Sequence, residues 1–260
     1  MRGCKHFRGI FLLLICAIRV RAQDIPDTLQ TPVNWQQAAA SYHPFPYKSL
    51  ILPGVMVAYG FTALNNHSLR QIDLKVKEEV WTEDPHKKIG FDTYLQFAPA
   101  AAVYSLNLAG IKGQHNYRDI SMIWAMSNLI AEGAVFSLKG ISHQLRPDGS
   151  DYSSFPSGHT AEAFLSAEFM RQEYKDVSPW YGIAGYAMAT ATGFLRMYND
   201  KHWFSNVVAG AGIGMASTRV TYWLYPKIQH FLFKDKHPNT ALMPSYQNGS
   251  FGLVFAHRFQ

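Results

Sequence analysis

Six apolar segments of 16 to 21 residues, almost free of charge, dominate the chain between residues 49 and 218. Buried strands usually stop after about four to eight residues, so segments of this length favour helices. The segments are Ser49–Leu69, Thr93–Ile111, Ile120–Leu138, His159–Tyr174, Trp180–Leu195 and Trp203–Thr218. Small residues are concentrated in the last two, which predicts helices whose backbones approach a neighbour closely. The sequence therefore predicts an all-α domain, a bundle of about six helices, with a short surface helix in the charged stretch 70–88.

The N-terminus has the layout of a secretory signal peptide. Basic residues open the chain, an apolar run covers Ile10 to Ile18, and the small residue Ala22 precedes Gln23. An uncleaved anchor is the alternative, but the apolar run is shorter than the ~20 residues that a bilayer requires. We therefore expect a protein that is exported from a bacterial cytoplasm and is periplasmic, membrane-associated or both.

The remaining domain boundaries follow from changes in composition. After the signal peptide (1–22) we expect an N-terminal lead over 23–48, the helical bundle over 49–226, and a C-terminal tail over 227–260. The tail changes period, because apolar residues alternate from Phe251 onward after the turn-forming pair Asn248-Gly249. That pattern predicts a short C-terminal β-hairpin.

Three short motifs carry the functional signal. In chain order they are Lys139, six residues and Arg146-Pro147; Pro156-Ser157-Gly158-His159; and Arg196, five residues, His202, three residues and Asn206. Each motif lies at the predicted end or start of a helix. In a bundle of antiparallel neighbours these particular ends lie at the same end of the bundle. The motif side chains are therefore predicted to converge.

The converging residue types suit a phosphoryl group. Two guanidiniums and one ammonium can neutralise a phosphate dianion, with arginine supplying two-point hydrogen bonding. Ser157 and Gly158 precede a helix, where free N–H groups and the helix dipole attract anions, and glycine permits close backbone approach. Two histidines, His159 and His202, can divide the work of nucleophile and acid. Glu132, Glu162 and Glu168 lack the histidines of a metal site, and we expect them to be interhelical partners, with no metal bound.

The three motifs resemble the signature of the type-2 phosphatidic acid phosphatase and vanadium haloperoxidase superfamily. That signature reads Lys-x6-Arg-Pro, then Pro-Ser-Gly-His, then Ser-Arg-x5-His-x3-Asp. This chain departs from it at two positions, where Leu195 replaces the Ser and Asn206 replaces the Asp. The resemblance implies an all-α acid phosphatase or haloperoxidase-like fold, to which the pattern of the tail adds the short hairpin.

The resemblance also implies a role for each motif residue. His202 would attack phosphorus and form a phosphohistidine, and His159 would protonate the leaving oxygen and later activate water. The phosphate-binding residues would be Lys139, Arg146, Ser157, Gly158 and Arg196, with no cofactor. Asn206, one helical turn after His202, would orient its ring through the far nitrogen but without a charge. We accordingly expect Asn206→Asp to raise turnover or leave it unchanged.

The predicted function is a metal-independent phosphatase that acts on phosphate monoesters or pyrophosphates, chiefly those of membrane lipids. Three alternatives remain: a soluble acid phosphatase for small phosphomonoesters, a haloperoxidase that holds vanadate, and a catalytically weak scaffold of the same fold. The formal net charge of +6 is spread along the chain rather than gathered in a run, and we expect no nucleic-acid partner.

Overall fold

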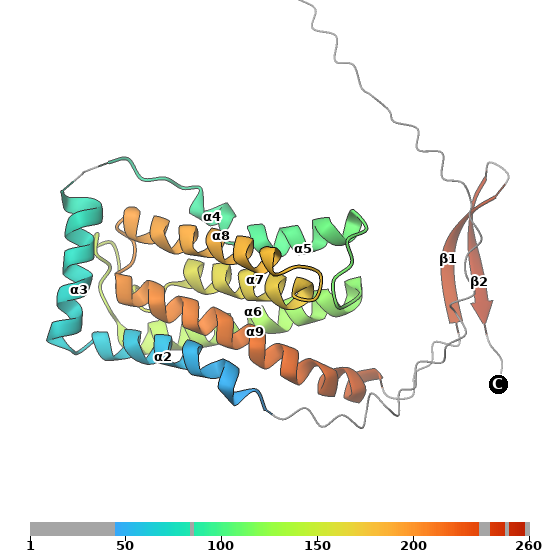
Figure 1. Cartoon of the computed structure of the whole chain (residues 1–260), viewed down its shortest axis with the longest axis horizontal. Helices are drawn as coiled ribbons and strands as arrows, with labels where there is room; N and C mark the ends of the chain where they lie inside the picture. Colours follow the sequence, from blue (N-terminus) through green and yellow to red (C-terminus); the bar gives the residue numbers. More distant parts are fainter. Residues whose placement is uncertain (1–44, 84–85, 234–239, 248–249, 258–260) are drawn as a thin grey trace, which may run out of the picture. The chain divides into compact units, whose positions relative to one another are not determined.

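The computed structural model describes residues 45–83, 86–233, 240–247 and 250–257. The predicted signal peptide, and the predicted lead as far as residue 44, lie outside this part of the chain. In order, the elements are α2 (Tyr47–Ala63), α3 (His67–Lys77), the π-helical turn η2 (Glu78–Thr82), α4 (Asp92–Leu95), α5 (Ala98–Leu108), α6 (Tyr117–Ser142), α7 (Gly158–Tyr174), α8 (Pro179–Tyr198), α9 (Phe204–Phe233), β1 (Thr240–Gln247) and β2 (Ser250–His257). The six longest predicted segments all contain a helix, so the predicted all-α bundle is confirmed (Figure 1).

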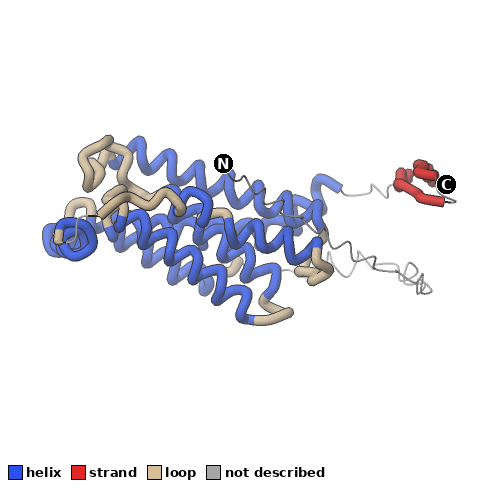
Figure 2. The backbone as a smooth tube through the Cα atoms, turned by 90° about the horizontal axis from the view of Figure 1, so that it is seen from above, coloured by secondary structure: helices blue, strands red, loops and turns tan. Residues whose placement is uncertain are grey.

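Helix α7 lies between its neighbours α5, α6, α8 and α9, and the helix axes run along a common direction (Figures 1 and 2). Its buried positions are not confined to one stripe, as expected for a helix that is surrounded by others. The carboxylate of Glu168, fully buried in this helix, accepts hydrogen bonds from Tyr186 of α8 and from Arg219 of α9, whose Nε lies 3.0 Å away. Glu168 is thus an interhelical partner, as predicted.

The small residues of α8 and α9 do permit close approach, and the helix they approach is α7. A Cβ atom added to Gly214 would lie 2.1 Å from the carbonyl oxygen of Ala161, and one added to Gly210 would lie 2.4 Å from that of Ser157. On α8, a Cβ at Gly185 would lie 3.3 Å from the Cα of Ala167. Side chains at the two α9 positions would push that helix away from the start of α7, where the second motif lies.

The first two apolar segments are each interrupted, contrary to the prediction of continuous helices. The segment from Ser49 to Leu69 breaks after Ala63, because Asn66 caps a new helix by accepting a hydrogen bond from Leu69 N at 3.1 Å. Helices α2 and α3 consequently meet at 94°. The segment from Thr93 to Ile111 is divided between α4 and α5. At the other end, α9 continues to Phe233, past the expected domain boundary at 226.

Apolar side chains cover much of the outer surface of the bundle. Exposed examples are Ile51, Leu52 and Val55 on α2, Leu129 and Phe136 on α6, and Trp180 and Ile183 on α8. Within the described residues, α6 alone is long and apolar enough to cross a membrane, and the bent α2–α3 pair passes the same criterion if counted together.

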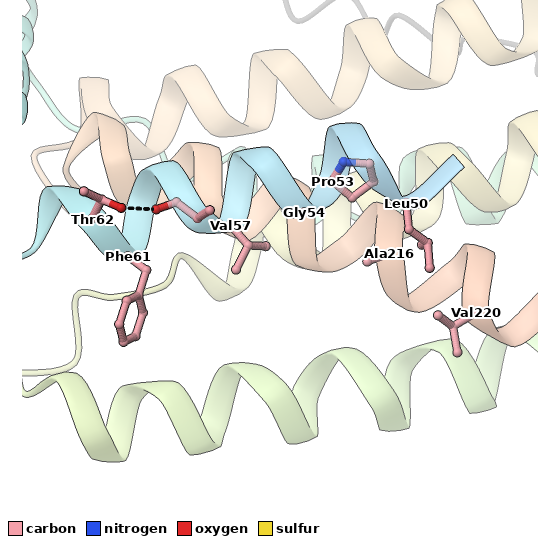
Figure 3. A pocket seen from close by; sticks show the side chains of 9 residues that line it. Leu50, Pro53, Gly54, Val57, Phe61, Thr62, Ala216 and Val220 are labelled. Carbon is pink, nitrogen blue, oxygen red and sulfur yellow. Dashed lines mark hydrogen bonds between the residues drawn. The ribbon is translucent and has the colours of Figure 1, made fainter. Parts of the chain in front are cut away.

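An apolar groove of about 540 Å³ runs along α2 and α9 (Figure 3). Its lining includes Gly54, Val57 and Phe61 of α2 and Ala216 and Val220 of α9. Leu50 and Thr62 mark its limits along α2, so the groove is about 18 Å long at 1.5 Å per helical residue.

Strands β1 and β2 pair in antiparallel register within the predicted tail, with Tyr246 opposite Phe251. The connecting pair Asn248-Gly249 lies outside the described residues.

Candidate active site

The three motifs meet at one end of the helices. Lys139 is in the last turn of α6, His159 is in the first turn of α7, Arg196 is in the last turn of α8, and His202 lies two residues before the start of α9. The same three cations act on both histidines. Besides burial, the charges of Arg196, Arg146 and Lys139 each lower the pKa of His159 and of His202. The antiparallel arrangement thus brings the predicted residues together.

His202 is buried and is oriented by main chain. Its Nδ1 lies 2.7 Å from the carbonyl oxygen of Ser154, a distance at which a protonated Nδ1 donates to that oxygen. Burial and the charges of Arg196, Lys139 and Arg146 hold the pKa of His202 well below its usual range. The ring is therefore neutral near pH 7, with its proton on Nδ1 and a free lone pair on Nε2.

The predicted contact between Asn206 and His202 is wrong. The Asn206 side chain instead donates from Nδ2 to Ser154 Oγ at 2.6 Å, and its main-chain oxygen accepts from Ser157 N at 3.1 Å. The expectation assumed helical spacing between residues 202 and 206, but α9 begins only at Phe204. His202 therefore lies on the preceding loop, and its ring reaches a carbonyl of the α6–α7 loop.

His159 is more accessible than His202. Burial, followed by the charge of Arg196, lowers the pKa of His159 to about 4, and Asp92 opposes this shift. In this state the ring is neutral at pH 7. A phosphate dianion between the cations would offset their charge and favour the protonated ring that an acid requires.

Asp92 is a functional candidate that the sequence analysis missed. Buried at the start of α4, it accepts a hydrogen bond from Nη1 of Arg196, 104 residues further along the chain. The Nε of Arg196 is buried without a hydrogen-bond partner among the described residues. Asp92 thus fixes the guanidinium while a second donor remains available for an anion. Its one sequence signal is a lone carboxylate at the edge of an uncharged segment.

The other two cations are held by the α6–α7 loop. Lys139 Nζ donates to the carbonyl oxygen of Ser153 at 2.6 Å, and Arg146 donates from Nε to Asp151 Oδ1 at 2.9 Å and from Nη2 to Ser153 Oγ at 3.2 Å. Ser153 therefore links both side chains. This short loop sets the separation of the two positive charges.

Helix α3 contacts the α6–α7 loop and the loop between α8 and α9. Lys77 donates to the carbonyl oxygen of Pro147 at 2.6 Å and lies 3.4 Å from Asp200 Oδ2. The indole of Trp203 donates to the carbonyl oxygen of Leu145 at 2.9 Å. The break between α2 and α3 is what permits α3 to cross this end of the helices (Figure 1).

Ser157 is the N-cap of helix α7. Its hydroxyl is buried and caps α7, lying 3.4 Å from Thr160 N, while its own N–H is occupied by the main-chain oxygen of Asn206. At Gly158 an added Cβ would meet only Val135 Cγ1, at 3.7 Å, within the described residues. Ser157 therefore orients the start of α7, and packing within the protein does not itself require glycine at 158.

Comparisons with known proteins agree with this site. Residues 120–230 match the family described as PAP2 superfamily. The lipid A 1-phosphatase of Porphyromonas gingivalis is 32% identical over 215 residues, which is 82% of this chain and 46% of that protein. The chain thus spans about half the length of this curated relative.

Two solved structures are also similar. The crystal structure of Aquifex aeolicus LpxE aligns with a TM-score of 0.46 and 18% identity, covering 58% of this chain and 94% of that one. A transmembrane PAP2 type phosphatidylglycerolphosphate phosphatase from Bacillus subtilis aligns with a TM-score of 0.45 and 17% identity, covering 71% and 99%.

The family match contains all three motifs, from Lys139 to Asn206, together with the helices that bring them together. The chain belongs to the PAP2 superfamily.

Proposed function

We propose that this protein is a metal-independent phosphatase that hydrolyses lipid phosphate monoesters or pyrophosphates through a phosphohistidine on His202. The observation that carries the proposal is a buried neutral imidazole, fixed at Nδ1 by the Ser154 carbonyl and surrounded by the charges of Lys139, Arg146 and Arg196. A free nitrogen lone pair inside a cluster of cations favours attack on a phosphoryl group.

The reaction divides into two transfers. In the first, Nε2 of His202 forms a bond to phosphorus while the bond to the leaving oxygen breaks, and His159 gives that oxygen its proton. In the second, His159 takes a proton from water, whose oxygen attacks the phosphohistidine and breaks the N–P bond. Inorganic phosphate leaves, and both rings return to their starting protonation states.

The cations act mainly in binding and charge stabilisation. Arg196 offers the buried Nε, and Asp92 prevents its guanidinium from turning away. Lys139 from the end of α6 and Arg146 from the α6–α7 loop add positive charge around the non-bridging oxygens.

Two observations favour a lipid substrate. The named relative is a lipid A 1-phosphatase, and the bundle exposes apolar side chains on α2, α6 and α8.

The apolar groove along α2 and α9 ends close to the site. The ring of Phe61, which lines the groove, packs on Phe155 with centroids 6.2 Å apart, and Phe155 precedes the second motif. We assign the groove to an acyl chain whose phosphate lies between the motifs. An exported, membrane-associated protein follows from this assignment and from the predicted signal peptide.

Phosphate release tests the proposal. The purified protein is offered phosphatidic acid and a lipid A phosphate in detergent micelles, and p-nitrophenyl phosphate in solution, alongside His202→Ala. We expect release from the lipids, loss of that release in the variant, and an acid-labile phosphoenzyme in the wild type. Preference for p-nitrophenyl phosphate would identify a soluble acid phosphatase, and absence of any turnover that depends on His202 would identify a scaffold.

A further inference from the structure

Asp73 is a buried carboxylate that takes no part in the proposed reaction. It lies in α3, is 1% exposed, and accepts two hydrogen bonds from Ser205, one from the main-chain N–H to Oδ1 at 2.8 Å and one from the hydroxyl to Oδ2 at 2.7 Å. Ser205 is in the first turn of α9, three residues after His202. The carboxylate therefore caps the helix that follows the proposed nucleophile, from 132 residues away.

Buried polar groups in close contact lie between this carboxylate and the nucleophile. The Ser205 hydroxyl, which donates its proton to Asp73, lies 3.4 Å from Asn206 Oδ1. Asn206 Nδ2 donates to Ser154 Oγ at 2.6 Å, and the carbonyl of the same serine lies 2.7 Å from His202 Nδ1. Every member is buried, with exposed fractions from 0% to 3%. Buried networks of this kind fix their members strongly, since a broken link leaves a polar group without water.

Asp73 differs from the other buried carboxylates at this end of the bundle because, among the described residues, it forms no ion pair. Asp92 is paired with Arg196, and Asp200 lies 3.4 Å from Lys77. The hydrogen bonds of Asp73 come from a neutral residue, and burial raises its pKa against the lowering effect of these hydrogen bonds and of the nearby charge of Arg70. Its negative charge remains available to offset the positive charge that develops on His202 during phosphorylation.

The position of Asp73 beside Ser205 also explains why this chain has Asn206 where the family signature has an aspartate. Burial already raises the pKa of Asp73. A second carboxylate at 206, separated from Asp73 by the Ser205 hydroxyl, would add like-charge repulsion in a buried region. An amide at 206 avoids that repulsion and still donates to Ser154.

We propose that Asp73 is a positioning residue for His202, and that through Ser205, Asn206 and Ser154 it performs the task that the family motif gives to an aspartate at 206. The proposal rests on the proposed function, in which His202 is the nucleophile.

An exchange of the two side chains tests the proposal. We compare wild type, Asp73→Asn, Asn206→Asp and the double variant for kcat, KM and the rate of phosphoenzyme formation. Asp73→Asn should lower kcat about tenfold or more with KM changed less than about twofold. Asn206→Asp alone should not raise kcat, and the double variant should regain most of the kcat that Asp73→Asn loses. Recovery identifies a charge role, because restoring a carboxylate at 206 does not restore the cap on Ser205.

Two further variants separate positioning from stability. Ser205→Ala keeps the main-chain cap on Asp73 but removes the hydroxyl link, and should lower kcat several-fold. Asp119→Asn alters another buried carboxylate, which accepts from Tyr225 OH at 2.7 Å, and should lower the melting temperature but leave kcat unchanged.

The outcomes distinguish the two proposals. Should Asp73→Asn not fold, an unchanged kcat in Ser205→Ala would overturn the inference. If the wild type is active, an unchanged kcat in Asp73→Asn would also overturn the inference. So would a double variant that is no faster than Asp73→Asn. A wild type without turnover that depends on His202 would overturn the proposed function itself.

Discussion

The Nδ1 atom of His202 lies 2.7 Å from the main-chain oxygen of Ser154. The acceptor that orients the proposed nucleophile is therefore a carbonyl of the α6–α7 loop, and the side chain of residue 206 acts on the loop that carries it. The orientation of the nucleophile thus depends on the packing between the α6–α7 loop and the start of α9.

His202→Ala should reduce phosphate release to less than about one hundredth of wild type while the fold is retained, because it removes the attacking nitrogen. Circular dichroism and the melting temperature check the fold. Retention of a larger fraction of activity would show that another group attacks phosphorus.

Activity should survive excess EDTA, because the proposed mechanism uses the fixed cations Lys139, Arg146 and Arg196. Phosphate release is measured before and after chelation and dialysis. Loss of activity that Mg²⁺ or Zn²⁺ restores would overturn the metal-independent mechanism.

Asp92→Asn should lower kcat/KM about 10²-fold, because the Arg196 guanidinium loses its buried anionic partner and can leave the phosphate position. Steady-state kinetics and the affinity for vanadate measure the effect. Asp119→Asn is the matched control, and an equal loss in the control would assign the effect to stability.

His159 should titrate with a pKa near 4 in the empty site, and about one unit or more higher when vanadate binds, because burial and Arg196 disfavour its charge until an anion is present. NMR of the ring protons measures both values. Since the folded pKa lies below the unfolded value of about 6.5, the unfolded state binds more protons between pH 6.5 and 4, and stability falls as the pH is lowered through that window. His159→Ala should flatten this dependence. A pKa near 6.5 in the empty site would contradict the described environment.

Gly54→Phe should raise the KM for a long-chain lipid phosphate about tenfold and leave the turnover of p-nitrophenyl phosphate unchanged. An added side chain at Gly54 meets no protein atom within 4 Å and would fill the groove along α2 and α9. Gly133 on α6 is equally open, and Gly133→Phe serves as the control. Equal effects of the two variants would remove the groove from the proposed lipid site.

The sequence by itself determined the bundle and the position of its reactive end. Segment length and low charge predict helices, and the motif spacing places Lys139, His159 and Arg196 at helix ends that antiparallel neighbours bring together. These signals are local, because a few neighbouring residues decide whether a helix forms and where its ends lie.

Only the tertiary structure decided which groups support the reactive residues. Asp92 reaches Arg196 across 104 residues, and Asp73 reaches Ser205 across 132. Both contacts depend on breaks within apolar segments, which turn α3 across the end of the helices and separate α4 from α5. The prediction that Asn206 contacts His202 was wrong for a related reason. It assumed that both residues lie in one helix, but α9 begins at Phe204, after His202. Partners far apart in sequence are set by packing between helices, and no local pattern specifies it.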